Sequence, residues 1–375
     1  MKTGIDVLEE QNFAPLKGLH IGLITNQTGV DSLGRRTIDV LAHAEGVKLV
    51  ALFSPEHGIA GKLDQDRVDN SKDEATGLPI YSLYGASRRP ADEDLKGLDA
   101  LVFDIQDAGV RFYTYTATMA YCMEAAAKNH LQVFVLDRPN PLGGERIEGP
   151  VLDADKIAFV AYFPMPIVYG MTLGELAHFF NAENKIGADL HVVKMAGWRR
   201  SMTYDETGLA WIPPSPNLRT VGETIPYPGI EILQAGGVSV GRGTPTPFEV
   251  LGAPWVHGDG LAAELARRKI PGVAYVAANF TPSTDLYKGQ ACEGVALTVT
   301  DPAVFDSVRN GVELAEALAK LYPDKFQVAK MIVLVGNSDT IAALQKSVPV
   351  NEIIESWKPA LAAFRAARER YLIYE

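Results

Sequence analysis

The chain has 375 residues, of which 47% are hydrophobic and 22% charged, a composition typical of a folded globular protein. At this length two domains are expected, with one large α/β unit as the alternative. The formal net charge of −11 argues against a nucleic-acid partner, and no apolar run approaches the ~18 residues that a membrane span needs.

In the first 140 residues, short β-branched runs alternate with helical patterns, which is typical of βαβ units on a parallel sheet. The predicted strands are nearly continuous in apolar residues, as expected for strands covered on both faces. They are residues 20–25, 47–53, 100–104 and 132–136. Helical spacing of apolar side chains predicts helices at residues 37–44 and 116–128.

A helix start is predicted at Thr172, because Glu175 follows it at the spacing of a capping box. This helix is expected to run to about residue 181, and a strand at 190–195 should follow it. The two cysteines, Cys122 and Cys292, lie far apart and lack CxxC spacing. Each is expected to be a buried thiol, with a disulfide between them as the alternative.

From Trp211 the sequence becomes rich in proline, and two segments are expected to form neither helix nor central strand. They are Ile212-Pro213-Pro214-Ser215-Pro216-Asn217 and Pro226-Tyr227-Pro228-Gly229. We place the domain boundary in this stretch, which gives domains of residues 1–222 and 223–375. The second domain is predicted to be mixed α/β, with strands 273–277 and 294–300 and helices 303–321, 340–346 and 350–371.

Polar side chains follow each of the four predicted N-terminal strands. Ligands of open parallel sheets bind outside the carboxyl ends of the strands, so these side chains are candidates for a polar small-molecule site. Turn and helix-cap preferences explain any one such loop better than function does, but four together favour function. The candidates are Asn26, Glu56, His57, Asp104, Gln106, Asp107, Asp137, Arg138 and Asn140.

Glu56 is the main catalytic candidate, because Pro55 stiffens the loop before it and Gly58 allows a tight turn after it. A carboxylic acid near apolar walls can stay protonated and donate to a leaving-group oxygen, the general-acid step of glycoside cleavage. The alternative is a helix cap or a salt bridge to His57, which is itself expected to orient Glu56 or bind substrate. Asp104 and Asp107 are the candidates for a second catalytic carboxylate.

Two further segments offer groups that bind sugars. Residues 110–115 place Arg111 beside aromatic rings, of which Tyr113 is the better candidate for stacking on a sugar. Arg242 lies between two glycines, which lets its backbone approach a ligand, and Thr244 follows. An arginine fork suits a carboxylate, so Arg242, then Arg111, then Arg138 are expected to meet an acidic substrate.

Other chemistries lack their motifs. After the first strand the chain reads Thr25-Asn26-Gln27-Thr28-Gly29 rather than GxGxxG, and it contains neither a P-loop nor a GxSxG elbow. No cofactor is therefore expected. A metal-dependent hydrolase built on His57, Asp104, Asp107 and Asp137 stays open as an alternative, although no HxH or HExxH spacing supports it. The expected site holds no metal.

An ordered series of segments resembles the NamZ-type exo-β-N-acetylmuramidases, a family formerly described as a domain of unknown function. The resemblance covers essentially the whole chain from Thr3 onward. Its segments are residues 53–58, 82–85, 104–115, 137–144, 170–175, 214–218, 241–248 and 252–255. One departure is Leu233-Gln234-Ala235-Gly236, where a glutamate-containing turn is expected.

The resemblance implies a Rossmann-like parallel-sheet N-terminal domain, a smaller mixed α/β C-terminal domain, and a site in the cleft between them. It implies release of terminal N-acetylmuramic acid (MurNAc) from the non-reducing end of peptidoglycan fragments, with Glu56 as the catalytic glutamate and Asn217 among the site residues. The expected ligands are muropeptides or MurNAc-GlcNAc saccharides, and no obligate protein partner is evident. A non-catalytic muropeptide-binding protein is the alternative from another class.

Localisation is left open by the sequence. No apolar segment of a signal peptide follows Met1-Lys2-Thr3-Gly4-Ile5-Asp6. A cytoplasmic protein is expected if this start is native, and a periplasmic or extracellular one if a leader was trimmed.

Overall fold

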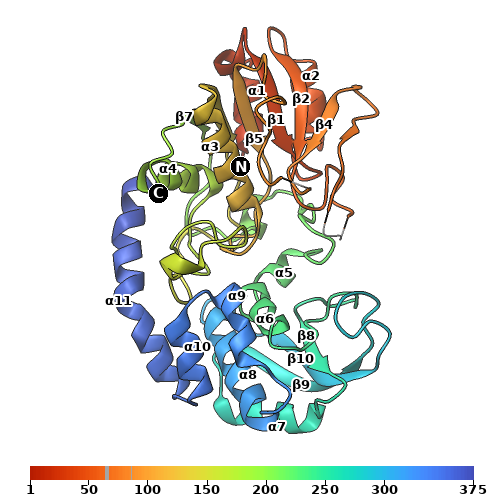
Figure 1. Ribbon diagram of the computed structural model, residues 1–375, viewed down its shortest axis with the longest axis vertical. Coiled ribbons are helices and arrows are strands. Elements are labelled where there is room, and N and C mark those ends of the chain that lie inside the picture. Colours follow the sequence, from red (N-terminus) through yellow and green to blue (C-terminus); the bar gives the residue numbers. More distant parts are fainter. Residues whose placement is uncertain (64–66, 86) are drawn as a thin grey trace.

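The computed structural model describes residues 1–63, 67–85 and 87–375, which fold around two separate sheets (Figure 1). The larger sheet has seven strands in the order β3-β4-β2-β1-β5-β6-β7, and all neighbours are parallel except β3 with β4. Its strands are β1 His20–Thr25, β2 Lys48–Ser54, β3 Ser71–Lys72, β4 Pro79–Ser82, β5 Ala100–Asp104, β6 Gln132–Leu136 and β7 Asp189–Val193.

The four strands predicted in the first 140 residues are confirmed, and they lie at the centre of the sheet. Every residue of β5 is buried, which explains its continuous apolar sequence. Alternate residues of β5 serve different faces: Leu101 and Phe103 pack into one core cluster, and Ala100 and Val102 into the other. The short strands β3 and β4 were not predicted, since β3 is exposed and β4 is mostly half-buried.

Helices cover both faces of this sheet. Those of the N-terminal region are α1 Gly4–Glu10, α2 Thr37–Ala42, α3 Tyr115–Lys128 and α4 Leu173–Glu183. The capping box predicted at Thr172 is present: Thr172 Oγ1 accepts a hydrogen bond from the Glu175 backbone N–H at 3.2 Å, and the Glu175 carboxylate accepts from the Thr172 N–H at 3.0 Å. The helices predicted at residues 37–44 and 116–128 are confirmed as α2 and α3.

The C-terminal region contains a three-stranded antiparallel sheet in the order β8-β10-β9. Its strands are β8 Val250–Ala253, β9 Val273–Phe280 and β10 Cys292–Val299, of which β8 was not predicted. The helices are α5 Val221–Thr224, α6 Tyr227–Gln234, α7 Gly258–Arg268, α8 Ser307–Leu321, α9 Ile332–Val335, α10 Ser338–Gln345 and α11 Val350–Arg368. Short 3₁₀ helices occur at Ala14–Leu16, Ala154–Lys156, Asp205–Thr207, Val328–Met331 and Glu369–Tyr371. The fold is therefore α/β in both regions.

The prediction that Pro226-Tyr227-Pro228-Gly229 is not helical is wrong. Helix α6 starts at Tyr227, with Pro226 as its N-cap and Pro228 in its first turn. A proline there gives up no intrahelical hydrogen bond, because the first N–H groups of a helix have no partner within it. This helix matters for the site, because it places Tyr227 and Glu231 one turn apart on the same face.

The end of the chain returns to the N-terminal region. Helix α11 runs from beside α8 and α10 to the neighbourhood of α4, where the chain ends (Figure 1). There the Tyr374 hydroxyl donates to Asp137 at 2.7 Å, and the Ile373 N–H donates to Glu175 at 3.0 Å.

Cys122 and Cys292 are free thiols buried in the fold, as expected from the sequence. Of the helices described, none has the length and apolar character to cross a bilayer.

Candidate active site

The candidate residues do not share one cavity. Two cavities lined by described residues contain candidates, and the larger of these two, about 270 Å³, contains Gln106 and Arg138 together with Thr28, Asp31 and Tyr204. The smaller, about 170 Å³, contains residues from both regions of the chain. Its lining residues are Glu56, His57, Phe112, Tyr113, Thr114, Tyr115, Val160, Ser215, Tyr227, Glu231, Arg242, Phe248 and Leu334.

We place the candidate active site in the smaller cavity. In the larger one the predicted polar groups are already bonded to protein: Arg138 to Asp104, and the Gln106 side chain to the carbonyls of Asp107 and Pro139. The smaller cavity brings two carboxylates, a histidine and an arginine together with aromatic rings. That combination of acidic groups and ring faces is what cleavage of a sugar requires.

Glu56 follows β2 directly after Pro55 and is partly exposed to the cavity. Thr114 Oγ1, just before α3, donates a hydrogen bond to Glu56 Oε2 at 2.5 Å. The Tyr84 hydroxyl also hydrogen-bonds Glu56; burial first, and then this contact, raises the pKa of Tyr84 to about 12. Two neutral hydroxyls therefore hold the Glu56 carboxyl in place.

Tyr84 is itself held by Arg88. The guanidinium carbon of Arg88 lies 3.7 Å from the centroid of the Tyr84 ring and 4.6 Å from that of Phe159. This stacking restrains the tyrosine whose hydroxyl meets Glu56.

The loop after Glu56 turns through two left-handed residues, His57 at φ 69° and Gly58 at φ 73°. The tight turn predicted at Gly58 is therefore present, and His57 adopts a conformation that costs energy for a residue with a side chain. His57 Nδ1 lies 2.7 Å from the Leu63 carbonyl oxygen. Because a carbonyl only accepts, Nδ1 carries the proton, and Nε2 is left to meet a ligand.

Aromatic rings from both regions line the cavity. Tyr113 packs edge-on against Tyr115, with centroids 4.9 Å apart, and against Tyr227 at 6.1 Å. Tyr227 also contacts Phe112 at 5.6 Å and Phe248 at 4.7 Å. These rings close the interface between the regions and give the cavity apolar walls.

The C-terminal region contributes an ion pair to the cavity. Arg242 donates to Glu231 Oε1 at 2.7 Å, and its Nε lies 3.6 Å from Asp285 Oδ2. The glycines on either side of Arg242 are both in the left-handed region, at φ 80° and 75°. They allow the tight turn that carries Arg242 back toward α6.

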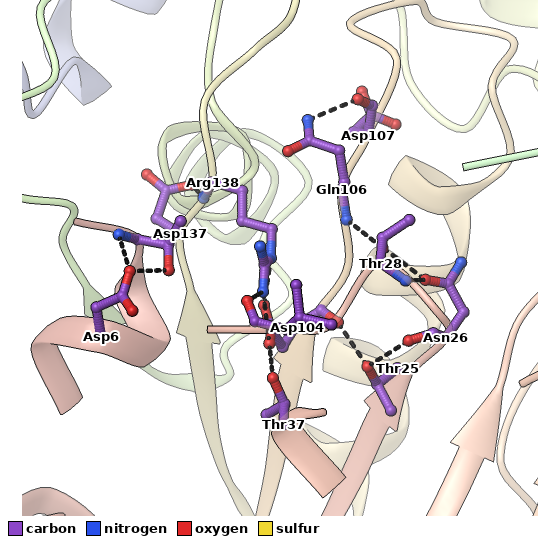
Figure 2. Close-up of polar contacts among 12 residues, drawn as sticks. Asp6, Thr25, Asn26, Thr28, Thr37, Asp104, Gln106, Asp107, Asp137 and Arg138 are labelled. Atoms are coloured by element: carbon purple, nitrogen blue, oxygen red, sulfur yellow. Dashed lines mark hydrogen bonds and ion pairs between the residues drawn. The ribbon is translucent and has the colours of Figure 1, made fainter. Parts of the chain in front are cut away.

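Asp104 and Arg138 form a buried pair (Figure 2), and neither lines the cavity that contains Glu56. Arg138 donates to both Asp104 oxygens, at 2.5 and 2.9 Å, and Thr37 Oγ1 donates to Asp104 Oδ2 at 2.5 Å. Asp104 is fully buried. The structure therefore gives Asp104 no access to a substrate at Glu56, and Arg138 braces the strand ends instead of meeting an acidic ligand.

Arg111 is also placed differently from the expectation of a carboxylate clamp. Its side chain is buried and donates to four backbone carbonyls: those of Pro150, Met165, Leu334 and Val335. Burial lowers the pKa of Arg111 to about 9. The guanidinium joins the two regions at the C-terminal end of α9, so it is not available to a ligand.

Four other predicted binding residues do not line the cavity and have hydrogen-bond partners within the fold. Asn26 donates to the Tyr115 hydroxyl at 2.9 Å and accepts from Thr28 (Figure 2), and Asn140 bonds the Met171 carbonyl at 2.9 Å. Asp137 caps the start of α4 through the Gly174 N–H at 2.8 Å, and burial raises its pKa to about 6. Thr244 Oγ1 donates to the Gly241 carbonyl at 2.6 Å.

Asn217 is buried and does not line the cavity, whereas Ser215, in the same proline-rich segment, does.

Asp107 lies buried behind the aromatic wall. Its Oδ2 accepts from the Gly109 N–H at 2.7 Å and from the Tyr169 hydroxyl, while Oδ1 is buried with no hydrogen-bond partner among the described residues. Burial raises the pKa of Asp107 from 3.8 to about 6. Asp107 does not line the cavity, so the structure does not bring it beside Glu56 as a second carboxylate.

The raised pKa of Asp107 predicts a pH-dependent stability. Between its unfolded value of 3.8 and about 6, the folded chain keeps the proton that the unfolded chain loses, so the free energy of unfolding falls as pH rises. Asp107→Asn cannot ionise and should remove this slope. Urea denaturation should show that the free energy of unfolding of the variant, relative to wild type, rises by up to about 3 kcal/mol between pH 4 and pH 7. If the stability difference between variant and wild type is the same at pH 4 and pH 7, Asp107 does not keep its proton in the folded chain.

Several lining residues were missed from the sequence. Thr114 lies in the segment 110–115, which was expected to bind sugars. Its hydroxyl, just before the predicted start of a helix, was the signal that could have identified it. Tyr227 and Glu231 were missed because their segment was interpreted as non-helical. Leu334 and Phe248 reach the cavity only through tertiary packing, and no local signal marks them.

The alternative of a metal site gains no support from the described residues. His57, Asp104, Asp107 and Asp137 form no group of three or more potential ligands there. Asp104 and Asp137 are instead occupied by Arg138 and by the α4 cap, respectively.

The fold and the cavity define a class: an α/β protein with an acid-bearing, aromatic-walled site where its N-terminal parallel sheet region meets a smaller C-terminal α/β region. Comparison with known proteins makes this specific. Residues 21–222 match the family model "Exo-beta-N-acetylmuramidase NamZ, N-terminal", and residues 225–374 match the corresponding C-terminal model. The chain belongs to the NamZ exo-β-N-acetylmuramidase family, whose members are glycoside hydrolases.

Individual relatives agree with this assignment. The chain is 44% identical over 378 residues to the peptidoglycan β-N-acetylmuramidase NamZ of Bacillus subtilis (strain 168), covering 100% of this chain and 91% of the relative. It also resembles crystal structures of two DUF1343 family proteins from Bacteroides fragilis NCTC 9343. The TM-scores are 0.93 and 0.81 at 39% and 31% identity, with 100% of this chain and 99% of each solved chain covered.

Proposed function

We propose that this protein removes terminal MurNAc residues from the non-reducing ends of peptidoglycan fragments, with Glu56 as the general acid. The observation that carries the proposal is the position of Glu56: it lies at the end of a sheet strand, is held by the hydroxyls of Thr114 and Tyr84, and faces an aromatic-walled cavity. The 44% identity to a peptidoglycan β-N-acetylmuramidase supports the choice of substrate.

In this proposal the terminal sugar occupies the cavity with its glycosidic oxygen beside Glu56. Glu56 donates its proton to that oxygen as the C1–O bond breaks, so the leaving saccharide departs as a neutral alcohol. A water molecule then adds its oxygen to C1 and gives up a proton, which restores the protonated acid. Thr114 and Tyr84 fix the direction of the carboxyl, which keeps proton donor and leaving group within hydrogen-bond reach. His57 Nε2 and the Tyr113 ring are the proposed contacts to the sugar.

The test is incubation with a chromogenic β-N-acetylmuraminide beside the matching N-acetylglucosaminide. Release of chromophore from the muraminide, with little from the glucosaminide, is expected. Turnover of neither would remove the proposed function and leave a muropeptide-binding protein as the alternative.

The domain division stays a proposal alongside this function. Residues 1–222 would carry Glu56 and the parallel sheet, and residues 223–375 would complete the cavity with Tyr227, Glu231 and Arg242. The return of residues 373–374 to the N-terminal region means that the second domain would also contribute contacts to the first.

Activity is predicted to be independent of added metal and nicotinamide cofactor, because the chemistry proposed for Glu56 needs only proton transfer. Dialysis against a chelator should leave turnover of the muraminide unchanged. A loss that zinc or magnesium restores would instead favour a metal-dependent hydrolase.

A further inference from the structure

Cleavage of a glycoside passes through a transition state with positive charge at the anomeric carbon, so the site needs an anion as well as an acid. The sequence offered Asp104 and Asp107 for that task, and neither lines the cavity. Among the described residues, the carboxylates that do line it are Glu56 and Glu231. They come from opposite sides, Glu56 after β2 and Glu231 from α6.

The surroundings of these two carboxylates differ in charge. Glu56 is hydrogen-bonded by the neutral hydroxyls of Thr114 and Tyr84, and no ion pair to it occurs in the part of the chain that the structure describes. Glu231 is ion-paired with Arg242 at 2.7 Å in a largely buried setting, with 11% of its side chain exposed. An arginine beside a carboxylate favours its ionised form, so Glu231 is suited to the role of fixed anion, and the role of proton donor falls to Glu56.

Resting on the function proposed above, we propose that Glu231 is the second catalytic carboxylate. It supplies the fixed negative charge that stabilises the positive charge developing at the anomeric carbon. Arg242 is then a positioning residue, because its hydrogen bond holds the Glu231 carboxylate in one orientation.

This assignment changes the role expected for Arg242. The guanidinium has Glu231 at 2.7 Å and Asp285 at 3.6 Å, so an incoming substrate carboxylate would meet two anions around one cation. Carboxylates this close to one another repel, so a substrate carboxylate would gain little binding energy from Arg242. Arg242 is therefore better placed to serve Glu231 than to select an acidic sugar.

The local sequence explains why Glu231 faces the site. Tyr227 and Glu231 are four residues apart on α6, so both project from one face of the helix into the cavity. The edge contacts of Tyr227 with Phe112 and Phe248 fix that face against the aromatic wall. Glu231 is in this way held on a rigid element on the side of the cavity formed by the C-terminal region.

The test uses the full chain and muraminides with two leaving groups, an activated dinitrophenol and a poorer methylumbelliferone. Glu231→Gln should lower kcat about 10²–10³-fold for both, because the positive charge at the anomeric carbon forms whichever group leaves. Glu56→Gln should lose much less with the activated group, which needs no proton. Asp285→Asn is the matched control, since Asp285 also meets Arg242 but lies outside the cavity lining; it should stay near wild type.

Arg242 variants separate positioning from sugar selection. Arg242→Met should lower kcat for muraminide and glucosaminide in proportion, and Arg242→Lys should recover part of the loss. A change in the ratio of the two kcat/KM values would make Arg242 a carboxylate clamp and overturn the positioning role.

Thermal unfolding of each variant shows whether it is folded. If wild type cleaves muraminides and a folded Glu231→Gln keeps full kcat, the role of Glu231 is wrong while the proposed function stands. If wild type cleaves none, it is the proposed function that fails.

Discussion

Glu56→Gln is expected to lower kcat on a methylumbelliferyl muraminide by ~10²–10⁴-fold, the range for losing a positioned general acid. The amide keeps an oxygen that can accept from Thr114, so the loop geometry should survive while the transferable proton is lost. Steady-state kinetics at several pH values checks this.

The control for Glu56→Gln is Glu249→Gln. Glu249 is a similarly half-buried glutamate directly after Phe248, but it does not line the cavity. Its replacement should leave kcat within about twofold of wild type, since substitutions away from the site change little. A fully active, folded Glu56→Gln would end the assignment of Glu56 as the acid.

Binding measurements with the Glu56 variant distinguish an enzyme from a binding protein. An enzyme whose acid is removed should still bind a MurNAc-GlcNAc saccharide with affinity close to that of wild type, because the aromatic wall and Glu231 remain. A wild type that binds the same saccharide without ever turning it over would favour the binding protein.

The strands and the catalytic loop could be predicted because their signals are local. Continuous apolar runs mark the central strands, and the segment from Pro55 to Gly58 carries its turn in its own residues. What local patterns cannot give is which polar residue already has a partner. Thr37 and Asp104 are 67 residues apart, and Arg111 and Leu334 are 223 apart, so their hydrogen bonds depend on tertiary packing.

The same reason explains why half of the cavity escaped prediction. A rule that places ligands at strand ends considers one sheet, whereas Tyr227, Glu231 and Phe248 approach from the other region. Proline at the start of α6 then concealed the helix that presents Glu231. Strand-end polarity pointed to Glu56, the proposed acid, but the strand-end residues Asp104 and Arg138 bond to each other at the sheet edge.

Arg138→Met should destabilise the fold by ~3–5 kcal/mol, because it leaves the fully buried Asp104 carboxylate without its cation. Methionine fills much of the same volume, so the cost reflects the uncompensated charge more than a cavity. Adding Asp104→Asn removes that charge yet keeps an oxygen for the Thr37 hydroxyl, and the double variant should regain ~1–3 kcal/mol. Arg89→Met is the control: this exposed arginine pairs with Glu124, and its loss should cost under about 1 kcal/mol.

Urea denaturation at pH 7 measures these differences, and kinetics on the folded Arg138→Met gives a second readout. Because Arg138 lies in the larger cavity, away from Glu56, the folded fraction should keep its kcat/KM for the muraminide and its preference over the glucosaminide. A variant as stable as wild type but weakened specifically toward the muraminide would return Arg138 to the role of substrate clamp. Loss of stability with intact selectivity would establish the Asp104–Arg138 pair as the contact that holds the ends of β5 and β6 together.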